Sequence, residues 1–209
     1  MADKPRGITP DPDRDLVLDS RSLRGIAHPL RVRLLGKLRE NGPSTASRLA
    51  VEVGTSSAAT SYHLRQLAAY GFIVEDEGEP GDLRQPRERW AARHHRSTFF
   101  DSTTVSGSPE DEAAAEVYMR SVAQAYARRV EAALDEAPGL PDWRQVGALN
   151  DYPLRMDPAA TARLTEELEE VIARYPRYEP QQELAQGERP VTVQLQIFPR
   201  PGWQPEQSS

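Results

Sequence analysis

The stretch STASRLAVEVGTSSAATSYHLRQLAAYGF, from Ser44 to Phe72, decides the fold of the N-terminal half of the chain. Its hydrophobic spacing predicts two short helices joined by a turn at Gly54, with the second helix ending at Gly71. A helix of about three turns, a turn glycine and a second helix with a polar start are typical of a helix-turn-helix. The same spacing also fits an ordinary pair of helices within an all-α core.

The second of these helices is predicted to have two contrasting faces. Thr60, Leu64 and Leu67 recur at helical spacing and are expected to face the core. The opposite face combines small side chains, hydroxyls, one aromatic ring and one guanidinium, which can lie close to a DNA groove and donate hydrogen bonds. Its members are Ala58, Ser61, Tyr62 and Arg65.

A predicted β-hairpin follows the two helices. Residues 72–75 have the pattern of a strand, residues 78–82 that of a Gly/Pro loop, and residues 87–92 alternate as a returning strand. Because a helix-turn-helix followed by a hairpin is a winged helix, Arg84 and Arg87 near the tip are expected to contact phosphate or the minor groove. The alternative for these arginines is an ordinary solvated loop.

Residues 23–99 resemble the winged helix-turn-helix domain of the ArsR superfamily of bacterial transcriptional regulators. The resemblance rests on HPLRVRLL at 28–35, SYHLRQL at 61–67, GFI at 71–73 and ERW at 88–90, in this order and spacing. It implies a dimer that binds an operator, usually represses transcription and is released by an effector. Many members sense metals through Cys pairs or His/Asp clusters, but this chain has no cysteine, which puts metal sensing in doubt.

We expect one set of residues on the helix-turn-helix and the wing to contact DNA. The outer face of the second helix would read bases in the major groove. The start of the first helix would donate to a phosphate, and the wing arginines would lie along the backbone. The full set is Ser44, Thr45, Ser57, Ala58, Ser61, Tyr62, Arg65, Arg84 and Arg87.

The distribution of charge supports a DNA-binding segment. The 209-residue chain has a net charge of −6, but residues 20–100 contain 13 Lys and Arg against 8 Asp and Glu, a local net of +5. The remainder of the chain therefore has a net charge of −11. Basic residues gathered in one domain are typical of nucleic-acid binding, although a basic patch is also a common solvated surface.

Composition argues against several other classes. No apolar run approaches the about 20 residues that span a bilayer, and residues 1–15 lack the apolar core of a secretory signal. We therefore expect a cytoplasmic protein with a disordered tail at 1–15. There is no glycine-rich phosphate loop and no catalytic constellation, and the adjacent His94 and His95 do not make a metal site. We expect no enzyme activity, no catalytic residues, no cofactor and no bound metal.

The segments on either side of the helix-turn-helix and its hairpin are predicted to be mainly helical. Helices over 16–27 and 29–41 are predicted to complete a domain that spans 16–105. A long helix over 109–137 has an apolar stripe at three- and four-residue steps. Its small and aromatic side chains favour a dimer interface, and packing on its own domain is the alternative. The interface residues are expected to be Met119, Val122, Tyr126 and Val130.

The C-terminal part predicts a small α+β unit over 141–200, followed by a tail at 201–209. Asp157 and Pro158 suit the N-cap and the first position of a helix that runs to Tyr175. For this C-terminal unit as a whole, we assign an accessory or dimerisation role only by elimination of other roles. Strands are expected at 143–149, 152–156 and, because apolar and polar residues alternate, at 191–197.

Together these patterns predict an α+β, mostly helical chain with an N-terminal winged helix-turn-helix, a long helix and a small α+β C-terminal unit. The expected function is a homodimeric, sequence-specific DNA-binding transcriptional repressor, with double-stranded DNA and a small-molecule effector as partners. One alternative is a winged helix that binds proteins. Another is a small-molecule sensor or enzyme built on the C-terminal unit, with a cavity lined by Trp143, Tyr152 and Phe198.

Overall fold

The first two helices begin at residues whose side chains favour those positions. In the computed structural model, α1 (Ser20–Ile26) is capped by Asp19, whose carboxylate accepts a hydrogen bond from the Ser22 N–H at 2.7 Å. α2 (Pro29–Asn41) starts at a proline, has His28 as its N-cap and has the predicted bounds.

The structure describes residues 10–11, 13, 15–76, 88–93, 97–100, 108–143, 146–180 and 182–202. The chain divides into two units. The larger unit is Pro10–Ala148 with Arg177–Arg189, and the smaller one contains Leu149–Pro176 and the chain from Pro190 onwards. Each unit is described on its own. Across the described residues, no helix combines the length and apolar character needed to cross a bilayer.

The N-terminal segment differs from the prediction. β1 (Asp15–Val17) is a strand that pairs in parallel with β5 (Ser97–Phe99), and α1 begins only at Ser20. The predicted helix over 16–27 therefore started four residues too early, because Asp19 uses its side chain as the N-cap. Asp15 is buried at the start of β1 and so is not part of a tail.

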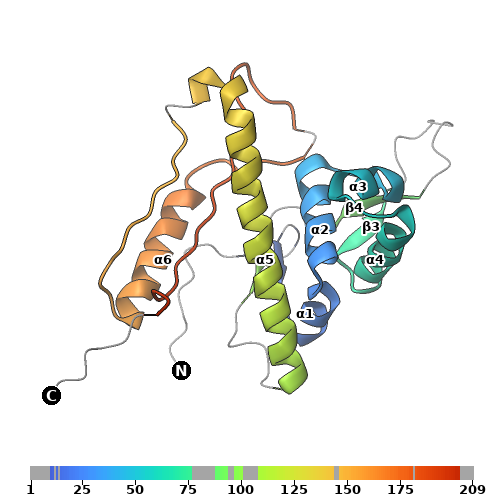
Figure 1. Cartoon of the computed structure of the whole chain (residues 1–209), viewed down its shortest axis with the longest axis horizontal. Helices are drawn as coiled ribbons and strands as arrows, with labels where there is room; N and C mark the ends of the chain where they lie inside the picture. Colours follow the sequence, from blue (N-terminus) through green and yellow to red (C-terminus); the bar gives the residue numbers. More distant parts are fainter. Residues whose placement is uncertain are drawn as a thin grey trace. The chain divides into compact units, whose positions relative to one another are not determined.

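The predicted helix-turn-helix is present as α3 (Ala46–Val53) and α4 (Ser57–Ala69). A three-stranded antiparallel sheet in the order β2-β4-β3 adjoins it (Figure 1). Its strands are β2 (Ser44–Thr45), β3 (Ile73–Glu75) and β4 (Arg89–Ala92).

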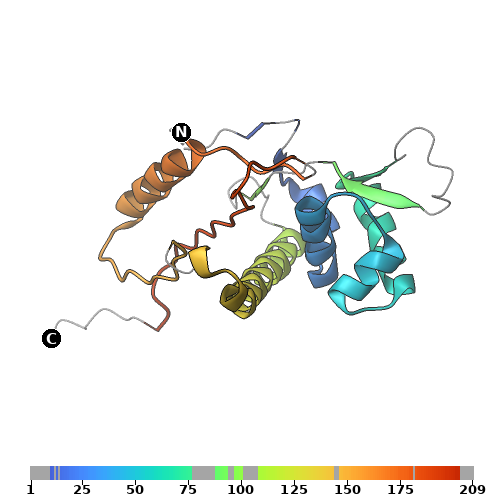
Figure 2. The same ribbon diagram turned by 90° about the horizontal axis from the view of Figure 1, so that it is seen from above.

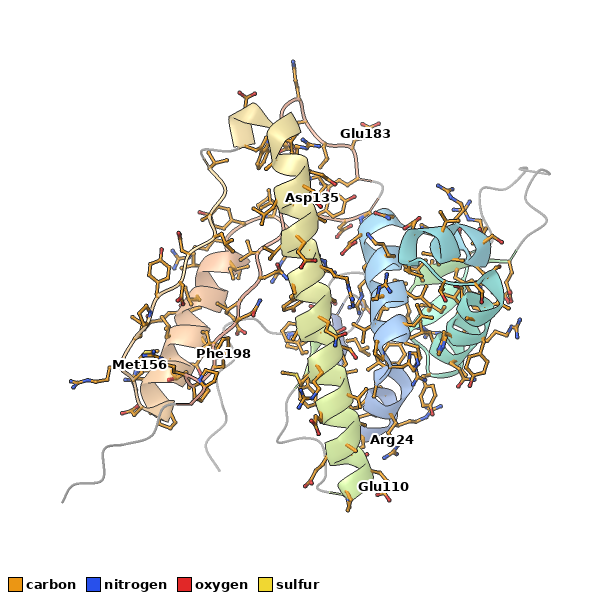
Figure 3. All side chains as sticks on the ribbon, viewed as in Figure 1. Arg24, Glu110, Asp135, Met156, Glu183 and Phe198 are labelled. Carbon is orange, nitrogen blue, oxygen red and sulfur yellow. The ribbon has the colours of Figure 1, made fainter. Side chains whose placement is uncertain are left out.

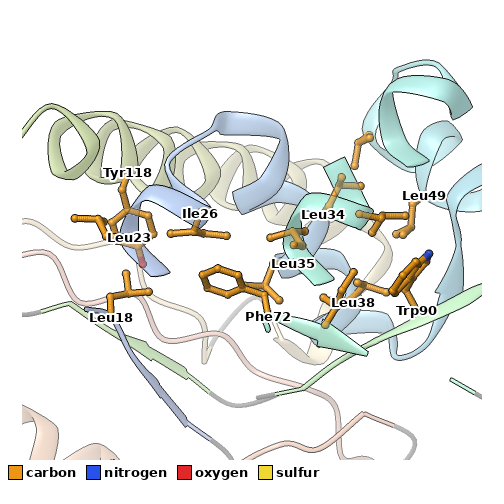
Figure 4. Close-up of a cluster of buried hydrophobic side chains, with 14 residues drawn as sticks. Leu18, Leu23, Ile26, Leu34, Leu35, Leu38, Leu49, Phe72, Trp90 and Tyr118 are labelled. Atoms are coloured by element: carbon orange, nitrogen blue, oxygen red, sulfur yellow. The ribbon is translucent and has the colours of Figure 1, made fainter. Parts of the chain in front are cut away.

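The core of the larger unit lies among α1 to α5 and the sheet. Leu64 and Leu67 of α4 are fully buried, as the helical spacing predicts, and Phe72 and Trp90 reach the same cluster from the sheet side (Figure 4). Burying each large apolar side chain contributes about 1.5–3 kcal/mol. The cluster therefore holds α4 firmly by its inner face.

α5 (Pro109–Glu136) lies along α1 and α2 (Figures 1 and 2). Tyr118 is buried on its inner face, with its ring edge-on to Phe100 at 5.7 Å between centroids. Arg24 of α1 is paired with Asp111, and Arg129 with Glu40 of α2 at 2.6 Å. The long helix is therefore part of the core of this unit along its inner face.

In the C-terminal part, the helix was predicted correctly and the strands were not. α6 (Pro158–Ala173) is capped by Asp157 as expected. Trp143 lies in a 3-10 turn (η2, Pro141–Trp143), and the described residues of 146–156 and 191–197 contain no strand. Alternation defines an apolar face, but a strand also needs a backbone partner, and the described part of the chain supplies none there.

Candidate nucleic-acid interface

The turn between α3 and α4 has the geometry that a helix-turn-helix requires. Gly54 ends α3 in the left-handed conformation (φ 66°), where an added Cβ would be strained. Ser56 then caps α4, because its side chain accepts a hydrogen bond from the Ala59 N–H at 3.1 Å. The hydroxyls of Ser47 and Ser57 lie 3.4 Å apart across the turn.

The outer face of α4 is exposed and polar. Ser57, Ala58 and Arg65 are exposed, the Tyr62 side chain is 56% exposed, and Ser61 is half-buried between them. No described residue forms a hydrogen bond or an ion pair with the Arg65 guanidinium. These five predicted contact residues therefore share one face, with a free cation at its centre.

The other predicted contact residues lie elsewhere. Thr45 is the N-cap of α3, and its hydroxyl accepts from the Arg48 N–H at 3.4 Å. Ser44 is buried in β2 and paired with Trp90, so its hydroxyl is not part of the exposed face. Arg84 and Arg87 lie outside the described residues.

The base of the β3–β4 hairpin is held by an ion pair. Arg89 of β4 approaches the carboxylate of Asp76 at 3.1 Å, and both side chains are about a quarter exposed. Glu75 is registered with Trp90 in the antiparallel ladder. The two strands are therefore anchored where they leave the domain core.

Two histidines and an arginine behind α4 form a cluster that the sequence patterns did not indicate. The His28 ring at the start of α2 lies 4.3 Å from the His63 ring on α4, and Tyr62 meets His63 edge-on at 5.1 Å. Nδ1 of His63 and Nε of Arg31 are buried without hydrogen-bond partners. The motifs at 28–35 and 61–67 contain all three residues, but nothing in the sequence pairs them.

Burial governs the ionisation of this His28–His63–Arg31 cluster. It lowers the pKa of both histidines below 6.5, and the positive charge of Arg31 lowers them further. Burial also lowers the pKa of Arg31, while the nearby Tyr62 and Tyr70 hydroxyls act in the opposite direction. Arg31 is therefore the permanent cation of the cluster at neutral pH.

A close contact between α1 and the end of α4 sets the position of the exposed face. A Cβ added at Gly25 would come within 2.4 Å of Cγ of Tyr70, the C-cap residue of α4. The Arg21 guanidinium lies over the same ring, 5.8 Å from its centroid. Only glycine allows α1 and Tyr70 to approach this closely.

The predicted interface residues of α5 do not lie on one free surface. Met119 is 52% exposed, but Val122 is partly buried against the core of its own unit. Tyr126 and Val130 are half-buried, and the Tyr126 ring has the Arg129 guanidinium 5.9 Å from its centroid. Packing on its own domain, the alternative to a dimer interface, therefore accounts for Val122.

The described residues also bear on two other kinds of site, a metal site and the cavity expected in the C-terminal unit. Among the described residues, no group of three or more His, Asp or Glu is placed to hold a metal ion, and His94 and His95 lie outside those residues. Tyr152 and Phe198 are 71% and 67% exposed, so they do not line the predicted cavity.

A comparison with known families bears on the helix-turn-helix. A family model described as a helix-turn-helix domain matches residues 26–76, from the end of α1 to the residue after β3. The chain contains a helix-turn-helix domain. This domain indicates DNA binding and transcription regulation, and it does not distinguish the ArsR superfamily from other helix-turn-helix regulators. No curated protein matches the chain.

Proposed function

We propose that the protein is a homodimeric, sequence-specific, ArsR-like winged-helix repressor that binds double-stranded DNA. In this proposal, Ser57, Ala58, Ser61, Tyr62 and Arg65 read the major groove. The residues between β3 and β4, with Arg84 and Arg87, act as the wing on the backbone or in the minor groove. Thr45 lies close to a phosphate.

The observation that carries the proposal is the unpaired Arg65 on an exposed polar face of α4. An arginine that is not neutralised by a carboxylate can donate two hydrogen bonds to O6 and N7 of guanine. Small residues beside it let the helix backbone approach the groove closely. The neighbouring Arg31 adds positive charge behind the same helix.

The same face argues against the protein-binding alternative. A protein-docking helix would present a broad apolar patch. On α4 the one large exposed hydrophobic side chain among the described residues is Tyr62, which also has a hydroxyl. On α3 it is Val51, which is 83% exposed and stands alone there. We therefore favour nucleic acid as the ligand of this face.

The test compares two arginine variants on a duplex selected from a random pool and on an unselected duplex. Arg65→Ala is expected to weaken binding to the selected duplex by about 1–3 kcal/mol and to relax sequence preference. Arg87→Ala is expected to weaken binding to both duplexes and to lower the slope of log affinity against log salt by about one.

Arg163→Ala serves as the control, because Arg163 is an exposed arginine on α6, which belongs to the other unit and is not part of the helix-turn-helix domain. It removes the same charge and should leave both affinities unchanged. If Arg65→Ala binds both duplexes as the parent protein does, α4 is not the reading helix. If no duplex is enriched from the pool, sequence-specific binding itself is wrong.

A further inference from the structure

Two stretches of the larger unit contain no acidic residue. Residues 20–39, which make up α1 and most of α2, contain six Lys and Arg and no Asp or Glu. Residues 53–74, which include α4, have no Asp or Glu either. The helix α4 contacts both α1 and α2. A cation in these stretches therefore finds a carboxylate only on another part of the chain.

Four of the six basic side chains of α1 and α2 have a partner. Arg24 pairs with Asp111 at the start of α5, where Figure 3 labels Arg24 and Glu110. The other three pairs are Lys37 with Glu40 at 3.2 Å, Arg33 with the carbonyl oxygen of Val53 at 2.8 Å, and Arg39 with the hydroxyl of Thr98 at 2.7 Å. Arg21 and Arg31 have no hydrogen bond or ion pair with any described residue.

These two unpaired arginines lie beside Tyr70, the C-cap residue of α4. The exposed Arg21 side chain has its guanidinium over the Tyr70 ring, and the hydroxyls of Tyr70 and Tyr62 interact electrostatically with Arg31. Asp19 also interacts electrostatically with Arg21, but it is already engaged as the N-cap of α1. Two guanidinium groups therefore lie on the flank of α4, next to its exposed polar face.

The charge of Arg31 is half-buried and uncompensated. Its Nε is enclosed without a hydrogen-bond partner, whereas its two terminal nitrogens, which also have no partner, are not enclosed. Burial lowers its pKa from 12.5, and among the described residues only tyrosine hydroxyls act against that shift. A half-buried cation without a counter-charge is unfavourable. This position therefore favours an anion that approaches the terminal nitrogens from the solvent.

A helix in the major groove of DNA has a phosphate backbone on each side. An α-helix with its side chains is about 10–12 Å across and the groove is about 12 Å wide, so residues on the flank of the helix reach the backbone. We propose that Arg21 and Arg31 bind backbone phosphates beside the groove that α4 enters. This inference rests on the proposed function and adds α1 and the start of α2 to the DNA-binding surface.

The exposure of the pair favours DNA over a small free anion. Arg21 lies in water, where a single ion pair contributes little. A duplex that α4 already holds presents its phosphates at a high effective concentration, and each phosphate contact also releases a condensed counterion. Contacts that are weak alone therefore add to an existing complex.

The test measures the slope of log affinity against log salt for the full chain on the selected and the unselected duplex. Arg31→Gln and Arg21→Gln are each expected to lower the slope by about 0.9. A fourfold rise in salt then reduces the affinity of the variant about 3.5-fold less than that of the parent. Both duplexes should respond equally, because phosphates carry no sequence information. Arg31→Lys keeps the charge and should keep the slope, whereas a merely structural role of the guanidinium would be lost in both Arg31 variants.

Arg24→Gln is the matched control, because Arg24 lies on the same helix as Arg21 but is already paired with Asp111. It should keep the slope of the parent. Urea unfolding would confirm that each variant is folded. If Arg31→Gln does not fold, Arg21→Gln at its exposed position decides the test.

A second measurement locates the contact on the duplex. Single phosphates of the selected duplex are replaced in turn by uncharged methylphosphonate, and the parent should lose affinity at a position to which Arg31→Gln is insensitive. Parent-like slopes for both Arg21→Gln and Arg31→Gln, or an equal loss for Arg24→Gln, would overturn this inference and leave the proposed function intact. So would an Arg31→Gln protein that responds to every replacement as the parent does. A parent that binds neither duplex would refute the proposed function, and this inference with it.

Discussion

At the scale of single residues, His63 shows where a side chain acquires its properties from the fold. Its ring lies 4.3 Å from that of His28 and belongs to the same helix as Arg65. The helical spacing was enough to predict that Thr60 and Leu64 face the core and that Arg65 faces outward. It could not predict the histidine contact, because His28 and His63 are 35 positions apart and no pattern within one helix links them.

The lowered histidine pKa values predict that acid destabilises the fold. Burial and Arg31 disfavour the protonated form, so below pH 6.5 the unfolded chain binds more protons than the folded one. The histidine contribution to the free energy of unfolding is fully present above pH 6.5. It is lost as the pH falls through 6.5, and the loss levels off below the pKa that the histidines have in the folded protein. Urea unfolding at pH 7.5 and 5.5 is expected to show this loss, and His63→Gln should reduce it.

Asp19 and Asp111, two carboxylates with a shifted pKa, do not contribute to the loss of stability between pH 7.5 and 5.5. Hydrogen bonds with Ser22 lower the pKa of Asp19 from 3.8. Burial raises the pKa of Asp111, but hydrogen bonds from Ser20 and Ser108 and the Arg24 charge outweigh it, so the net shift is also downward from 3.8. Their contribution is lost only below about pH 3.8. If His63→Gln loses as much stability between pH 7.5 and 5.5 as the parent, the histidine assignment is wrong.

At the scale of elements, local chemistry explains which predictions were confirmed. The bounds of α2, the start of α5 and the start of α6 follow from proline at the first turn and from a capping side chain, which are signals within a few residues. β1 pairs with β5, about 80 positions away, and no sequence pattern near β1 predicts that pairing. The described residues of 143–149, 152–156 and 191–197 form no strand for the same reason, since alternating apolar and polar residues do not provide a backbone hydrogen-bonding partner.

For α5 we predict that its inner face stabilises the whole larger unit. Tyr118 is 7% exposed and packs on Phe100, so Tyr118→Ala is expected to lower the free energy of unfolding by about 3–5 kcal/mol. Gln124→Ala, at an exposed position of the same helix, should change it by less than about 0.5 kcal/mol. Equal effects of the two changes in urea unfolding would mean that α5 does not share the core.

At the scale of the whole molecule, the proposed dimer depends on which surface of α5 is free. A single reading helix gives a small footprint, whereas two helices about 34–36 Å apart meet successive major grooves. Val122 is a poor probe of such an interface, because it packs against its own core and a charge there would unfold the unit. Met119 belongs to the same predicted set and is 52% exposed.

We therefore predict that Met119→Glu separates the two copies at α5 while leaving each copy folded. A carboxylate enclosed between two helices would lose its hydration without gaining a partner, whereas in the free protein it remains in water. Val117→Glu is the matched control, because Val117 is 41% exposed only two positions away, on nearly the opposite side of the helix. Light scattering should give a reduced mass for Met119→Glu and the parent mass for Val117→Glu. The reverse result would move the interface to the other side of α5. A parent that is monomeric at all concentrations would remove the dimer from the proposed mechanism.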